Sequence, residues 1–122
     1  MGLMDQLMSA VKGGDASKVK AGIERLVGEQ GGLSALKSKF EASGFGDKVQ
    51  SWIGKGDNEP VSKDEVKSAL GEDVRRISAE SGASEDEVAS GLANVLPDAV
   101  DRATPEGRLP EAGERTAAIF DR

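Results

Sequence analysis

The sequence predicts an all-α protein, a compact multihelical domain of about six or seven short helices. Along most of the chain, apolar residues recur at intervals of three and four, as they do on the buried face of an amphipathic helix. Two Ser-x-x-Glu patterns, beginning at Ser62 and Ser84, are typical of a capping box at a helix start. No convincing strand pattern is present, and 122 residues suit one domain with a modest core.

The first 30 residues predict two amphipathic helices. Gly13 and Gly14 end the first, and Asp15 or Ser17 can cap the second. Because pairs of glycines separate these helices from each other and from the rest, residues 1–30 are expected to form an N-terminal segment that can dock loosely. The apolar stripes consist of Leu3, Met4, Leu7, Met8 and Val11 in the first helix, and of Val19, Ile23, Leu26 and Val27 in the second.

The middle of the chain predicts a helix over residues 33–43, a short helix capped by Asp47, and a turn over residues 54–60. Trp52, the only tryptophan, is either a core anchor of the short helix or an exposed contact residue for a partner. The glycines at 54 and 56 could also belong to a phosphate-binding loop. Such a loop lies between a strand and a helix, and no strand is predicted here, so a tight turn is the preferred interpretation. The predicted inward residues are Leu33, Leu36, Phe40, Val49, Trp52 and Ile53.

The second half predicts a helix from Ser62 to Gly71, another over residues 72–81 with Gly82 as its left-handed cap, and a last helix after Ser84. Pro97 interrupts that last helix. It either kinks the helix or opens a separate one as its first residue, and we favour the second alternative. The predicted core residues here are Val66, Leu70, Val74, Ile77, Val88, Leu92, Val95, Leu96, Ala99, Val100 and Ala103. Residues 111–122 are predicted to be a mobile C-terminal tail.

The residue types that are absent from the chain reduce the number of chemical functions that it can have. The chain has no Cys, His or Tyr, so it lacks a thiol nucleophile, a disulfide framework and the commonest general base and metal ligand. The sequence therefore identifies no catalytic, cofactor-binding or metal-binding residue, and we expect no enzyme and no small-molecule substrate. A carboxylate-based enzyme or cation site is the third hypothesis, with candidate oxygen ligands at Asp57, Glu59 and residues 85–87. The helix macrodipole explains the acids at 85–87 equally well.

The net charge of −6 lies entirely in residues 61–122, since residues 1–60 contain equal numbers of acidic and basic side chains. An acidic half repels phosphate backbones and anionic lipid, although solubility is the simpler explanation. No apolar run approaches the roughly 20 residues of a membrane helix, and the N-terminus lacks the basic region of a secretory signal. We expect a cytoplasmic protein without membrane contact.

Residues 72–96 contain the apolar and glycine spacing of a helix-turn-helix unit around Gly82. A DNA-reading unit would place its second helix so that residues 85–87 face the duplex, and three acidic residues there oppose binding to a polyanion. The same spacing arises wherever three helices pack at a corner. The structural corner is therefore the preferred reading, and nucleic acid is not the expected partner.

The string from Gln50 to Pro60, Gln-Ser-Trp-Ile-Gly-x-Gly-x-Asn-x-Pro, is the most distinctive part of residues 31–110. With this string, residues 31–110 resemble the YidB-like family of bacterial proteins. The resemblance implies a small multihelical fold, YidB-like or homeodomain-like, in a bacterial cytoplasm, and it implies no activity and no catalytic residues. Residues 1–30 and 111–122 lie outside this resemblance. The residues that carry it are 31–36, Phe40, 44–47, 49–54, Gly56, Asn58, 60–62, Leu70, Gly71, Leu96, Pro97 and 100–110.

The function that the sequence favours is a non-enzymatic module for protein–protein contact, including contact between copies of itself. The N-terminal helices, rich in Met, Leu and Gly, suit a contact surface because Met adapts to irregular partners. The alternative is a DNA-binding module using residues 72–96.

Overall fold

The computed structural model describes residues 3–28, 32–53 and 58–104. These residues form six helices and no strand, which confirms the all-α prediction. In chain order the helices are α1 (Leu3–Ala10), α2 (Ala16–Gly28), α3 (Gly32–Ala42), α4 (Gly46–Ile53), α5 (Lys63–Ser81) and α6 (Glu85–Ala103). Most of the predicted turn at 54–60 and the whole predicted tail at 111–122 lie outside the described residues. None of the helices described here is long and apolar enough to cross a lipid bilayer.

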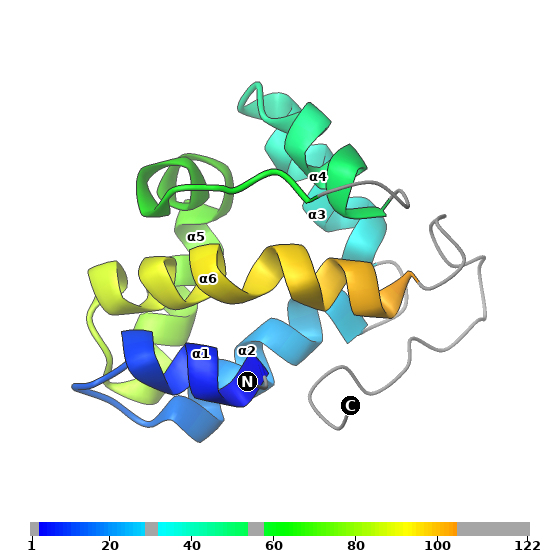
Figure 1. Ribbon diagram of the computed structural model, residues 1–122. Coiled ribbons are helices and arrows are strands. Elements are labelled where there is room, and N and C mark those ends of the chain that lie inside the picture. Colours follow the sequence, from blue (N-terminus) through cyan, green and yellow to red (C-terminus); the bar gives the residue numbers. More distant parts are fainter. Residues whose placement is uncertain (1–2, 29–31, 54–57, 105–122) are drawn as a thin grey trace.

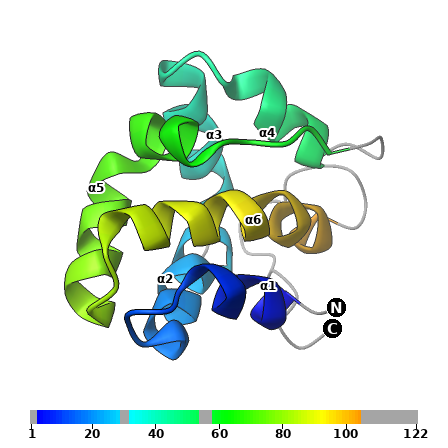
Figure 2. The same cartoon turned by 60° about the vertical axis from the view of Figure 1, so that its left-hand side comes forward.

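Helix α6 lies across the middle of the molecule (Figure 1). Helices α1 and α2 lie on one side of it and α3 and α4 on the other, and the same order is seen from a second direction (Figure 2). Helix α5 crosses the N-terminal part of α6 at a steep angle and joins it through a tight turn (Figure 2). Helix α6 contacts α1, α2, α4 and α5, so four of the other five helices share it as a packing partner.

The sequence of α6 explains its central place. Seven of its side chains are fully buried, and they are spaced so that apolar surface faces several neighbours rather than one. Those residues are Val88, Ala89, Leu92, Val95, Leu96, Ala99 and Val100.

The prediction that Pro97 opens a separate helix was wrong, because α6 continues through Pro97 to Ala103. Proline removes one backbone hydrogen bond from a helix interior. Buried residues lie on both sides of it, Leu96 before and Ala99 after, so packing against the neighbouring helices holds the two segments in one helix.

Helix α5 begins and ends as predicted. Ser62 accepts a hydrogen bond from the backbone N–H of Glu65, whose side chain reaches back to Ser62, and Gly82 closes the helix with φ of 79°. The break expected near Gly71 is a kink within one element, at Leu70 (φ −120°, ψ 31°). Beside the kink, Ser43 Oγ donates to the carbonyl of Ser68 (3.1 Å).

The N-terminal helices pack against the core, and how loosely they are docked stays a prediction. Six of their predicted apolar residues are buried: Leu7, Val11, Val19, Ile23, Leu26 and Val27. Met8 departs from the predicted stripe, since 54% of its surface is exposed. Of the two predicted caps for α2, Asp15 is the one used, because its Oδ1 accepts from the N–H of Ser17 (3.0 Å). Asp47 lies inside the first turn of α4 instead of capping it.

The linker between α1 and α2 is held against the turn between α5 and α6. The N–H of Asp15 donates to the carbonyl of Ser81 (2.9 Å). Gly14 lies so close to this turn that a Cβ on it would be 2.4 Å from the backbone nitrogen of Ala83. The absence of a side chain at position 14 is therefore a condition for docking the N-terminal segment.

We predict that Gly14→Ala lowers the free energy of unfolding by about 1–3 kcal/mol, because the new methyl group meets backbone that cannot move aside. Gly71→Ala is the matched control, since a Cβ there would meet only Arg75 Nη1 at 3.7 Å. The control is expected to leave the free energy of unfolding unchanged or to raise it by up to about 1 kcal/mol, because alanine is more favourable than glycine inside a helix. Urea unfolding followed by circular dichroism measures both. Equal stability of the two variants would contradict the close approach.

Candidate functional site

The predicted helix-turn-helix unit, residues 72–96, comprises most of α5, the turn at 82–84 and the first half of α6. Its apolar skeleton is buried as a packing corner requires, with Ile77, Val88 and Leu92 fully inaccessible. Ser84 caps α6 in the predicted capping box with Glu87. The sequence therefore placed this corner correctly.

The carboxylate of Glu87 joins this corner to the N-terminal linker. Its Oε2 accepts from the backbone N–H groups of Lys12 (3.0 Å) and Gly13 (2.9 Å), and its Oε1 accepts from the N–H of Ser84 (3.2 Å). These bonds, that of Ser84 first, lower the pKa of Glu87 below its ordinary value. The linker thus covers the N-terminal end of α6 on this side, where a DNA-reading helix would need free access to a groove.

The outward side of α6 carries acidic or neutral groups at the positions whose side chains the structure describes. Lys67 of α5 pairs with Asp86, and this hydrogen bond lowers the pKa of Asp86 and raises that of Lys67. A surface of this sign opposes a phosphate backbone. The exposed or half-exposed residues that face outward are Glu85, Asp86, Ser90, Ala93, Asn94, Pro97, Asp98 and Asp101.

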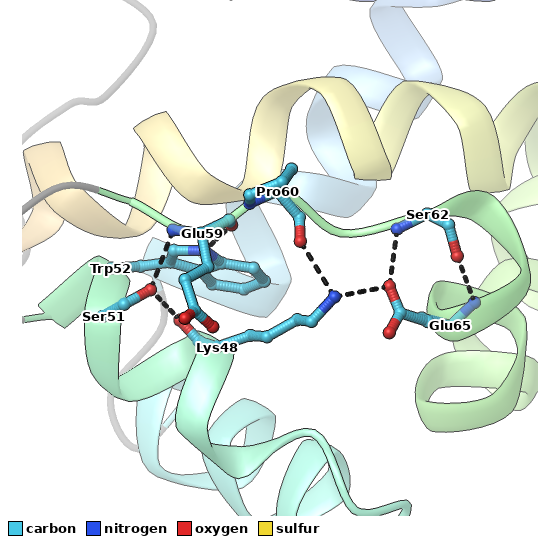
Figure 3. Close-up of polar contacts among 7 residues, drawn as sticks. All are labelled: Lys48, Ser51, Trp52, Glu59, Pro60, Ser62 and Glu65. Carbon is cyan, nitrogen blue, oxygen red and sulfur yellow. Dashed lines mark hydrogen bonds and ion pairs between the residues drawn. The ribbon is translucent and has the colours of Figure 1, made fainter.

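Trp52 is a core anchor, and the alternative of an exposed contact residue was wrong. Its side chain is fully buried, and its ring meets that of Phe40 edge-on with centroids 5.5 Å apart. The indole Nε1–H donates to the carbonyl of Glu59 (2.7 Å). This bond ties α4 to residues 58–62, here named the strap, which run in extended form past α6 (Figure 3).

Two further side chains of α4 hold the strap. Ser51 Oγ accepts from the N–H of Glu59 (3.0 Å) and donates to the carbonyl of Lys48 (2.6 Å). The Lys48 side chain runs parallel to the strap (Figure 3) and its Nζ donates to the carbonyl of Pro60 (3.0 Å) and to Glu65 Oε1 (2.8 Å). The bond from Lys48 is the main cause of the lowered pKa of Glu65.

The sequence did not reveal Lys48 as a structural tie, because its partners lie 12 and 17 residues away and no local pattern marks them. The same holds for Asp73. This nearly buried carboxylate of α5 accepts from Lys39 Nζ (2.8 Å) and from Arg76 (2.9 Å). One acidic residue in a helix, such as Asp73, does not indicate from the sequence that Lys39, 34 residues earlier, will pair with it.

Two of the depressions that described residues line are shallow and open to solvent. One lies between α3 and α4, has a volume of about 390 Å³ and is lined by Lys37, Glu41, Gly44, Gly46, Asp47 and Gln50. The other, of about 450 Å³, lies at the kink of α5. Within the described ranges no three His, Cys, Asp or Glu side chains are grouped to hold a metal ion. The candidate oxygen ligand Asp57 and the glycines at 54 and 56 lie outside those ranges.

We predict that Trp52→Phe lowers the free energy of unfolding by about 1–3 kcal/mol or more. The Glu59 carbonyl loses its hydrogen-bond donor, and the smaller ring leaves a cavity in the core. Gln50→Ala, at an exposed position of the same helix, is the control and is expected to stay within about 0.5 kcal/mol of the parent protein. Circular dichroism must follow the urea unfolding, since Trp52 is the only tryptophan. An unchanged midpoint for Trp52→Phe would contradict the anchoring role.

Glu87 gives a pH prediction. Its pKa is lowered on folding, so its stabilising effect is complete above the ordinary carboxyl pKa and disappears as the pH falls through the lowered value. Glu87→Gln is expected to melt below the parent protein at pH 7, and the difference is expected to shrink towards about pH 3. Glu85→Gln removes a neighbouring exposed charge and serves as the control. A melting difference that is the same at both pH values would refute the role of the ionised carboxylate.

The comparison with known proteins identifies a family. A family model described as YidB-like protein matches residues 1–112. No curated protein and no solved structure matches the chain. The match includes residues 1–30, beyond the motif-bearing stretch of residues 31–110, in agreement with the packing of α1 and α2 into the core. The chain belongs to the YidB-like protein family.

Proposed function

We propose that the protein is a non-enzymatic helical module that acts by contact with other proteins, including a second copy of itself. The observation that carries the proposal is the position of Met8 on the outer side of α1. Among the described residues Met8 is the one large hydrophobic side chain that is exposed. All the other described large apolar side chains are buried or half-buried, so Met8 is the described position at which an apolar contact with a partner can form.

Helix α1 is suited to present Met8. Leu7 and Val11 hold its inner side in the core, so the outer side has a fixed orientation. Asp5, Ser9 and Lys12 are polar neighbours of Met8, with Asp5 and Ser9 joined by a hydrogen bond from Ser9 Oγ to the Asp5 carbonyl (3.1 Å). An apolar centre with a polar rim is the usual anatomy of a protein interface. A contact centred on one methionine is expected to be weak and reversible.

The DNA-binding alternative, residues 72–96, gains no support from the corner geometry. The linker at Lys12 and Gly13 covers one side of the N-terminal end of α6, and the outward side is acidic. The cytoplasmic location, the absence of membrane contact and the absence of enzymatic activity stay predictions from the sequence.

The experiment compares Met8→Glu with Ser9→Glu, which adds the same charge at the adjacent exposed position. Removing residues 1–30 is unsuitable, because it would also take Val19, Ile23 and Val27 out of the core. Light scattering over a range of concentrations measures self-association, and affinity capture with mass spectrometry measures other partners. We expect the parent protein and Ser9→Glu to share association or capture that Met8→Glu loses. Equal behaviour of the two variants would contradict the contact surface, and a parent protein that neither associates nor captures a partner would contradict the proposed function.

A further inference from the structure

We propose that the depression at the kink of α5 binds a small anion that carries a phosphate or carboxylate group. Residues of α5 line most of this depression, and Lys39 of α3 adds to its lining. It is named here the kink depression, and its volume of about 450 Å³ leaves room for a small molecule. The proposal goes beyond the contact function of Met8, since the described residues that line the depression include none from α1.

Arg75 is the residue that indicates an anion most directly. Its guanidinium lies beside Gly71, one turn earlier in α5, with 3.7 Å between Arg75 Nη1 and the place of a Cβ on Gly71. Within the described part of the chain, no carboxylate lies at ion-pair distance from Arg75. A guanidinium presents parallel N–H groups that match two oxygens of a phosphate or a carboxylate. The donors of Arg75 are therefore available to a ligand in the kink depression.

Lys39 brings a second cation to the kink depression. Its Nζ donates to Asp73 Oδ2 (2.8 Å), and Arg76 donates to Oδ1 of the same carboxylate (2.9 Å). One carboxylate thus balances two cations, and one positive charge remains. The Asp73 side chain is 5% exposed and that of Lys39 is 45% exposed, so the carboxylate positions the lysine without covering it. Because an ammonium has three N–H donors, Lys39 retains donors for an anion.

The remaining charges at the kink depression limit the kind of anion. Lys67 is paired with Asp86, and Glu72 adds a negative charge to the lining. Two positive charges, that of Arg75 and that left over at Asp73, therefore face one negative charge. This excess suits a small anion of one or two charges. A polyanion would also meet the repulsion of the whole chain, whose net charge is −6.

Gly71 leaves the backbone of α5 open at the kink depression. It follows the kink at Leu70, and a Cβ on it would meet no atom but Arg75 Nη1 within 4 Å. Packing therefore does not require glycine at this position, although glycine inside a helix costs about 1 kcal/mol relative to alanine. Close approach of a ligand to the backbone is a role that glycine serves. An anion bound by Arg75 beside Gly71 explains both residues.

Nuclear magnetic resonance of the ¹⁵N-labelled full chain tests the proposal. The chain is titrated with sodium phosphate and, separately, with sodium acetate at constant pH and ionic strength. We expect saturable shifts of the amides of Gly71 and Arg75 with at least one anion, and the anion that binds more tightly identifies the preferred group. Arg75→Gln is expected to weaken binding about tenfold, because a charge-assisted pair of hydrogen bonds is lost. Arg25→Gln removes an equal charge from α2 and is expected to leave binding unchanged.

Gly71→Ala supplies a measurement that does not alter the charge. This variant is expected to be at least as stable as the parent protein and to bind the anion several-fold less tightly, because the methyl group occupies the space beside Arg75. Unchanged binding in Arg75→Gln or Gly71→Ala would overturn the site, as would an equal loss in Arg25→Gln or the absence of saturable shifts with both anions. The test of Met8 is independent of each of these outcomes.

Discussion

The structure depends on the burial of α6 by its neighbours. Each fully buried aliphatic side chain contributes about 1.5–3 kcal/mol relative to exposure, and this helix contains five such residues beside its buried alanines. Those five residues are Val88, Leu92, Val95, Leu96 and Val100. Because one helix cannot bury that much surface against a single partner, α1, α2, α4 and α5 all pack on it. Pro97 is tolerated inside α6 for the same reason.

Polar ties at the two ends of α6 fix how its neighbours are placed. At the N-terminal end, Glu87 binds the backbone of Lys12 and Gly13. Towards the C-terminal end, Asn58 Nδ2 of the strap donates to the carbonyl of Pro97 (3.4 Å). The indole N–H of Trp52 donates to the carbonyl of Glu59 in the same strap. Trp52 and Asn58, two residues of the string on which the family resemblance was based, therefore help to build the fold.

The sequence predicted those features that depend on short stretches of chain. The two capping boxes, the left-handed Gly82 and the buried stripes of α2 to α6 follow from local patterns, and the structure confirms them. Features that depend on distant partners were missed or wrong: the continuity of α6 through Pro97, and the ties of Lys48 and Asp73. The exposure of Met8 belongs to this group, because the stripe of α1 is wide and only contact with α6 decides which side is buried.

Native-state hydrogen exchange tests the central role of α6 most directly. If α6 is the buried centre of the fold, its amides between Val88 and Val100 exchange only when the whole domain unfolds, so their exchange free energy equals the free energy of global unfolding. The amides of α1 are then expected to exchange at a clearly smaller free energy, since that short terminal helix rests mainly on one neighbour. Exchange from α6 that is as easy as exchange from α1 would contradict the account.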